Sequence, residues 1–88
     1  MEPPDIRWDD AKNDRLKRER GVSFDEIIAQ KLLAVKRHPG RGHQRLMLFE
    51  HKDYVWVVPY VAHGGEIFLK TIFPSRKYTK LWREGKLR

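Results

Sequence analysis

The residues best suited to chemistry in this sequence are cations that stand where another residue type is expected. Lys70 interrupts the run 67–73, which is otherwise apolar at nearly every position. A charged group there needs either a route to water or an anionic partner. Arg76 and Lys77 follow Ser75 in the first turn of an expected helix, where the helix dipole disfavours cations. Residues that break a local rule are candidates for function.

Their spacing predicts a phosphate site. Strand alternation puts Lys70 on the same face as Phe68 and Ile72, and an extended chain past Pro74 brings Arg76 to that side. The backbone amides at a helix start also bind phosphate. Two cations are therefore expected to converge at one strand end. The alternative for Lys70 alone is a stem that covers the core while its ammonium group reaches solvent.

Proton transfer would use a histidine or a tyrosine. The four histidines all fall in expected loops or turns, where an imidazole can gain or lose a proton or simply be exposed: His38, His43, His51 and His63. We single out His51 and His63, with Tyr78, whose helical spacing also fits core packing. His38 and His43 are five residues apart without further ligands, and the chain has no cysteine, so no metal site or cofactor is expected.

Charge indicates a polyanion as the partner. The net charge is +7, and residues 1–31 hold seven basic and eight acidic side chains, whereas residues 32–88 hold twelve basic and four acidic. Lys77, Lys80 and Arg83 extend the cluster around Arg76 and are expected to bind the polyanion backbone. The alternative is that the charge serves solubility alone. No glycine-rich phosphate loop, nucleophile elbow or paired-carboxylate pattern is present, which disfavours small-substrate enzymes.

These residues are expected to be positioned by a single α+β domain spanning residues 1–88. Asp9 and Gly21 flank one helix, and Ser23 with Glu26 forms a capping box that opens a second. A three- to four-stranded antiparallel sheet and a carboxy-terminal helix follow, with Pro59 at a strand end or bulge. One sheet face packs on the second helix. The expected helices are 10–20, 24–32 and a last one capped by Ser75 and ended by Gly85, and the expected strands are 33–37, 46–50, 54–58 and 66–73.

Several strings resemble the BrnT-type toxins of bacterial toxin-antitoxin pairs, which share the RelE-like ribonuclease fold. The strings are Ile6-Arg7-Trp8-Asp9 with Lys12, Arg20-Gly21-Val22-Ser23-Phe24-Asp25-Glu26, and Pro74-Ser75-Arg76. The resemblance implies a type II toxin that cleaves RNA and inhibits translation, and it carries Lys12, Arg76 and Arg45 into the site. A histidine that members commonly have before the glycine is replaced here by Arg20.

The leading hypothesis is a cytoplasmic endoribonuclease that needs no metal. Arg76, Lys70 and Arg45 hold the phosphate during attack by the ribose 2′-hydroxyl, and His51, His63 or Tyr78 exchanges protons. The resemblance implies mRNA as substrate, free or on the ribosome, and a cognate antitoxin through which operator DNA is bound. No membrane segment or cofactor is expected.

Two alternatives remain open. The first is a non-catalytic module that binds nucleic acid or the ribosome with the same basic face. The second is a structural protein whose basic face docks on an acidic companion chain.

Overall fold

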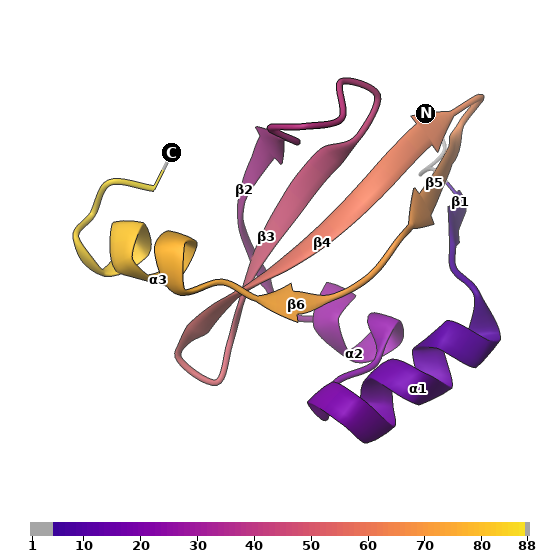
Figure 1. Cartoon of the computed structure of the whole chain (residues 1–88), viewed down its shortest axis with the longest axis horizontal. Helices are drawn as coiled ribbons and strands as arrows, with labels where there is room; N and C mark the ends of the chain where they lie inside the picture. Colours follow the sequence, from indigo (N-terminus) through magenta and orange to yellow (C-terminus); the bar gives the residue numbers. More distant parts are fainter. Residues whose placement is uncertain (1–4, 88) are drawn as a thin grey trace.

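A curved sheet with helices on both faces forms the protein (Figure 1). The computed structural model describes residues 5–87, which contain six strands and three helices, and it confirms the expected α+β class. In chain order these are β1 (Asp5–Arg7), α1 (Asp10–Arg20), α2 (Phe24–Ile28), β2 (Lys31–Arg37), β3 (Arg45–His51), β4 (Tyr54–His63), β5 (Glu66–Leu69), β6 (Phe73–Pro74) and α3 (Arg76–Arg83).

The sheet is mixed, so the expectation of three or four antiparallel strands was wrong. Its strand order is β1-β5-β4-β3-β2, with β6 paired to β4, and β1 runs parallel to β5. Strand β1 has three residues, two of them charged, which is too short to show an alternating pattern. It forms because Ile6 pairs with Ile67, far along the chain.

Strand β4 organises the sheet because it has three partners. Its amino-terminal half pairs with β3 and β6, and its carboxy-terminal half pairs with β5. Tight two-residue turns join it to β3 and β5: Lys52 and Asp53 have φ of 54° and 59°, and Gly64 and Gly65 have φ of 56° and 83°. Positive φ at both positions defines the turn type that matches the strand twist in hairpins. His51 and His63 accordingly end strands β3 and β4 and do not lie in the turns.

Residues 66–73 do not form one continuous strand covered on both faces, as had been expected. The chain leaves the sheet after Leu69 and returns at Phe73. Ile72 therefore turns fully into the core while Lys70 stays exposed, and the predicted shared face of these two residues was wrong. Arg20 donates to the Ile72 carbonyl and ties α1 to this connection.

Pro59 does not end its strand either, because β4 continues through it to His63. The Pro59 carbonyl accepts a 2.8 Å bond from the Lys70 amide. The N–H and C=O of a strand residue point toward the same neighbour. The Pro59 nitrogen, which has no hydrogen to donate, therefore faces residue 70, just beyond the end of β5.

Caps define the two amino-terminal helices as expected. The Asp9 side chain accepts from the Lys12 amide, and Gly21 closes α1 at φ 77°. Ser23 and Glu26 form the capping box of α2. Helix α2 ends at Ile28 and not at residue 32, because pairing of Lys31 with Glu50 begins β2 two residues before the expected strand. No helix within residues 5–87 is long and apolar enough to span a membrane.

Each sheet face has its own apolar core. On one face, buried residues of α1, α2 and the segment between them pack against buried residues of the sheet and of the β5–β6 connection. This core consists of Leu16, Val22, Phe24, Ile27, Phe49, Val58, Leu69 and Ile72. This confirms the predicted contact of the second helix. On the other face, Tyr78 and Trp82 of α3 pack on Leu46, Leu48, Val55 and Val57. The buried Thr79 hydroxyl accepts from the Val55 amide at 2.8 Å, which fixes α3 to β4.

Candidate functional site

A hollow of about 330 Å³ lies where α1, the β2–β3 loop and the β5–β6 connection meet beside β4. We call it the basic cavity. It is lined by Lys12, His38, Arg41, Gln44, Pro59, Lys70, Thr71 and Phe73.

The charge of the basic cavity has one sign. Lys12, Arg41 and Lys70 line it together with His38, and no carboxylate does. None of the three cations forms an ion pair with another residue in the range 5–87. Converging cations without counter-charges raise the local concentration of anions. The composition of the cavity therefore suits an anion.

Lys12 and Lys70 are held in place by their backbones. The Lys12 amide donates to the Asp9 carboxylate at 2.9 Å in the first turn of α1. The Lys70 amide donates to the Pro59 carbonyl, which prolongs the β4–β5 pairing by one residue. The Lys70 ammonium lies 5.4 Å from the centroid of the Phe68 ring. Both lysines were predicted site residues, and the structure brings them to the same cavity.

The β2–β3 loop supplies the remaining polar groups. The His38 amide donates to the Gln44 carbonyl at 3.2 Å and closes the loop, and His38 Nδ1 accepts from the Gly40 amide at 3.0 Å. In a neutral imidazole this bond leaves the proton on Nε2. Gln44 is only 6% exposed, and it lines the cavity together with His38 and Arg41. A side-chain amide on a cavity wall can donate to or accept from a polar ligand.

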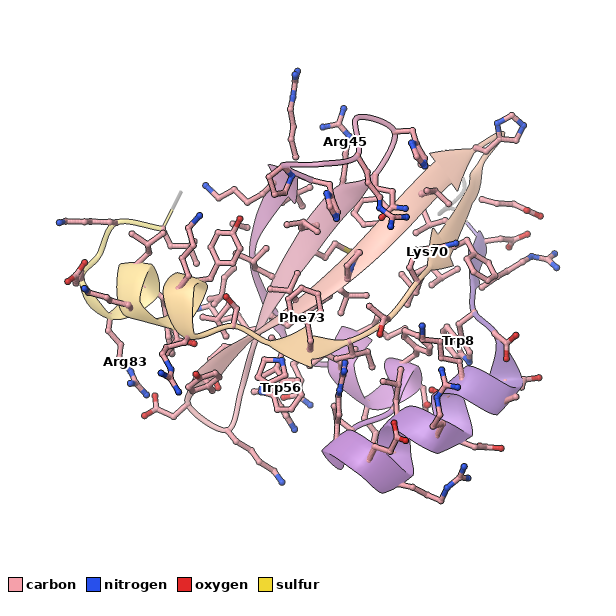
Figure 2. The ribbon with its side chains drawn as sticks, viewed as in Figure 1. Trp8, Arg45, Trp56, Lys70, Phe73 and Arg83 are labelled. Atoms are coloured by element: carbon pink, nitrogen blue, oxygen red, sulfur yellow. The ribbon has the colours of Figure 1, made fainter. Side chains whose placement is uncertain are left out.

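A second hollow, of about 470 Å³, shares His38 and Gln44 with the basic cavity. Arg37 and Arg45 also line it, and they are direct partners across β2 and β3. Like charges directly opposite each other destabilise a sheet unless an anion lies between them. Figure 2 shows Arg45 beside the β2–β3 loop and Lys70 at the end of β5. Arg45 thus neighbours the basic cavity without lining it.

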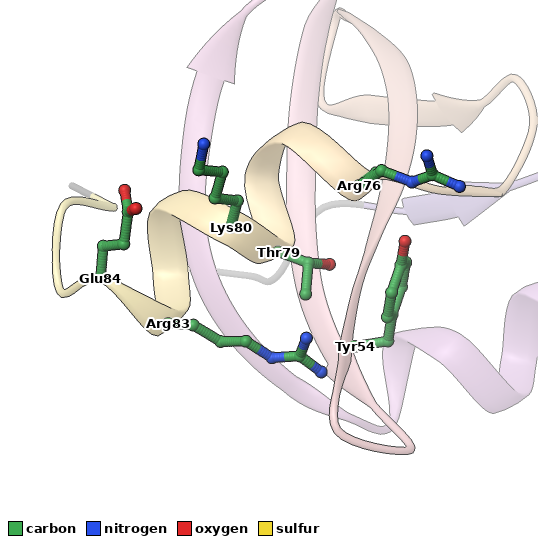
Figure 3. A pocket seen from close by; sticks show the side chains of 6 residues that line it. All are labelled: Tyr54, Arg76, Thr79, Lys80, Arg83 and Glu84. Carbon is green, nitrogen blue, oxygen red and sulfur yellow. The ribbon is translucent and has the colours of Figure 1, made fainter.

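The cations of α3 lie elsewhere. We call Arg76, Lys77, Lys80 and Arg83 the α3 surface. Arg76, Lys80 and Arg83 line a hollow of about 320 Å³ with Tyr54, Thr79 and Glu84. Figure 3 shows Arg76 and Arg83 extending toward Tyr54, whereas Lys80 points to the other side of the helix. Arg76 does not line the basic cavity.

Part of the α3 surface serves structure. Arg83 donates to the Asp53 carbonyl at 3.0 Å and lies 3.9 Å from the Asp53 carboxylate. The Lys77 ammonium lies 5.7 Å from the centroid of the Tyr78 ring. Tyr78 itself packs in the core beneath α3. The packing interpretation of Tyr78 is therefore the one its surroundings support.

The remaining predicted proton carriers do not line the basic cavity. His51 packs edge-on against Trp56, with 5.9 Å between ring centroids, on the sheet face of α2. His63 is exposed at the end of β4. His38 is the histidine of the cavity. Within residues 5–87, no group of three or more histidine or acidic side chains is placed to hold a metal ion.

The residues that the wall takes from the β2–β3 loop were missed as site residues by the sequence-based prediction: His38, Arg41 and Gln44. The basic, glycine-rich segment 38–43 was a usable signal for the first two, since such loops approach anions closely. Gln44 offered no signal, because its burial depends on how the loop folds over β4.

The fold and the cavity define a small α+β protein with a hollow lined by three cations and a histidine. The fold is similar to that in the crystal structure of the Brucella abortus ribonuclease toxin BrnT, with a TM-score of 0.54 and 15% sequence identity. The similarity covers 82% of this chain and 96% of that one. It confirms the fold that the sequence motifs implied. The sequence matches no protein-family model and no curated protein.

Proposed function

We propose that this protein is an endoribonuclease toxin that binds and cleaves RNA at the basic cavity. The observation that carries the proposal is the convergence of Lys12, Arg41 and Lys70 with His38 in a hollow without carboxylates. The fold shared with a ribonuclease toxin and the BrnT-like strings support it. RNA offers the matching chemistry, because each backbone phosphate carries a negative charge.

The reaction in this proposal is an internal transfer at phosphorus. The 2′-oxygen forms a bond to the adjacent phosphorus and its proton passes to water. The bond from phosphorus to the 5′-oxygen breaks, and that oxygen takes a proton from water or from a lysine ammonium. The products are a 2′,3′-cyclic phosphate and a 5′-hydroxyl.

The chain's own groups act on the charge that develops. Lys12, Arg41 and Lys70 stabilise the additional negative charge on the phosphate oxygens, and the cost of arranging them is met during folding. His38 donates from Nε2 to one of these oxygens, since its Nδ1 already accepts from the Gly40 amide. The Gln44 amide contacts the phosphate or the ribose. In this mechanism positioning and charge do the work that a strong general base does in other nucleases.

The biological setting follows the same proposal. The free toxin lowers translation by cutting mRNA, in solution or on the ribosome, in the cytoplasm. A cognate antitoxin covers the cavity and carries the operator-binding activity. The basic surface around the cavity suits an antitoxin segment of opposite charge.

The test uses the purified chain, free of any antitoxin, with end-labelled RNA and EDTA. We expect cleavage to leave cyclic-phosphate or 3′-phosphate ends and 5′-hydroxyl ends. RNA that stays intact both with and without ribosomes would contradict the proposal. RNA bound with steep salt dependence but never cut would favour the non-catalytic binding module instead.

A further inference from the structure

Phe68 is an aromatic side chain left open beside the basic cavity. It is 37% exposed and is the aromatic member of the four large apolar side chains exposed within residues 5–87. The other three, Ile6, Leu32 and Val35, lie on the outer strands β1 and β2. Strand β5 is flanked by β1 and β4, so the exposure of Phe68 is not an effect of the sheet edge.

The ring lies on the same sheet face as Pro59, which is one of the residues that line the cavity. Phe68 pairs with Val61 across β4, and Pro59, two residues before Val61, lines the cavity from that face. Helix α3 covers this face only around Leu46, Leu48, Val55 and Val57. The part of the face at Phe68 is therefore open, and it continues directly into the cavity wall at Lys70.

Cations flank the ring, and one of them is free. Arg7 is the partner of Phe68 across β1, but its guanidinium is paired with Glu66 at 3.3 Å and with Asp5 at 3.8 Å. The Lys70 ammonium lies 5.4 Å from the ring centroid and has no ion-pair partner within residues 5–87. A cation over an exposed ring contributes less than a stacked base does. A base can therefore displace Lys70 from the ring, and the flexible lysine stem then reaches a phosphate.

We propose that Phe68 is the stacking platform for an unpaired base of the substrate, whose neighbouring phosphate lies in the basic cavity. This inference rests on the proposed function and names its substrate more closely. Phe68 and Lys70 are two residues apart, about 7 Å in extended backbone, which is the scale of one nucleotide. A duplex keeps its base faces stacked, so the substrate is single-stranded at this position. Phenylalanine has no hydrogen-bonding group, so any base is accepted there.

The test measures binding of a labelled 2′-O-methyl oligonucleotide, which cannot be cut, to the full chain and to Phe68→Leu and Phe68→Tyr. A series of the same oligonucleotide carries one abasic nucleotide at successive positions. We expect Phe68→Leu to weaken binding of the intact strand about 5- to 150-fold, with Phe68→Tyr close to the wild type. We expect one abasic position to weaken the wild type by a similar factor and to leave Phe68→Leu unaffected.

The outcomes separate this inference from the nuclease proposal. The stacking platform is wrong if Phe68→Leu binds the intact strand as tightly as the wild type does. It is also wrong if Phe68→Leu binds every abasic strand more weakly than the wild type does, by the same factor as it binds the intact strand. The second result would mean that the ring only positions Lys70. If the oligonucleotides show this dependence on Phe68 but unmodified RNA is never cut, the nuclease proposal is contradicted and the stacking proposal stands. A wild-type chain that binds no oligonucleotide would overturn both.

Discussion

The basic cavity and the α3 surface carry similar numbers of cations in different geometries. The cavity draws its cations from α1, the β2–β3 loop and the end of β5, and they face one hollow. The α3 surface presents neighbours on one helix, which spread outward, and Glu84 lies among them. Converging charges stabilise a localised anion, whereas spread charges attract an extended one. Convergence is therefore a better guide to a reaction site than net charge is.

Within residues 5–87, Arg83 is the α3 cation that forms an ion pair, whereas Arg76, Lys77 and Lys80 form none. Arg83 of α3 is engaged with Asp53 at the β3–β4 turn. In the cavity, Lys12, Arg41 and Lys70 have no ion-pair partner within residues 5–87. A side chain that already has a structural partner gives up that contact to bind a ligand. Under the proposed function, we therefore expect cleavage at the cavity and general RNA attraction at α3.

The largest effect is expected at the cavity wall on α1. Lys12→Met should slow RNA cleavage about 100-fold, because it removes one cation aimed at the developing charge. The matched control is Arg15→Met, an exposed cation on the same helix that does not line the cavity. Single-turnover cleavage rates measure both variants. If Lys12→Met and Arg15→Met slow cleavage equally, the distinction between converging and spread charges is wrong.

A smaller effect is expected on α3. The double variant Lys77→Met/Lys80→Met should weaken RNA binding several-fold at moderate salt. The rate at which bound RNA is cleaved should change little. Each lost backbone contact lowers the salt slope by about 0.7 for a single strand, so the pair lowers it by about 1.4. Binding titrations over a range of salt concentrations measure this slope. A double variant that binds normally but cuts slowly would move α3 into the catalytic site.

The smallest effect concerns a residue in neither region. Hydrogen bonds lower the pKa of the Glu26 carboxyl to about 2, from an ordinary value of 4.5. The largest contribution comes from the Lys17 side chain and the next from Ser23. A depressed carboxyl pKa stabilises the fold above the ordinary value, and this contribution is lost as pH falls from about 4.5 to about 2. Glu26→Gln should lack this loss and cleave RNA normally at neutral pH.

Thermal unfolding of both proteins across that pH range provides the check on Glu26. We expect the wild type to lose more stability than Glu26→Gln as the solution is acidified. Parallel loss in the two proteins would contradict the role of the Lys17–Glu26 pair. A cleavage defect in Glu26→Gln would show that the contact between α1 and α2 also affects the cavity.

Local signals in the sequence predicted the parts of the fold that depend on local contacts. Asp9, Ser23 and Ser75 each cap a helix as expected, because a cap needs only residues within one turn. Lys70 was conspicuous for the same reason, as a charge within an apolar run. The parallel pairing of β1 with β5 was out of reach, since it joins Ile6 to Ile67.

The candidate site was predicted only in part because it is assembled from distant segments. Lys12 and Lys70 meet there, but the expected extension of the strand to Arg76 fails when the chain turns inward at Ile72. Arg41 and Gln44 reach the cavity through the folding of the β2–β3 loop over β4. The alternation of side chains along one strand does not indicate where a loop from other strands will lie.

The most direct test sets Lys70 against Arg76. Lys70→Met and Arg76→Met remove one cation each, from the cavity and from the α3 surface, and their single-turnover cleavage rates on one RNA can be compared with the wild type. The account predicts a loss of about 100-fold for Lys70→Met and a change of no more than a few-fold for Arg76→Met. A large loss confined to Arg76→Met would contradict it and place the reaction at α3.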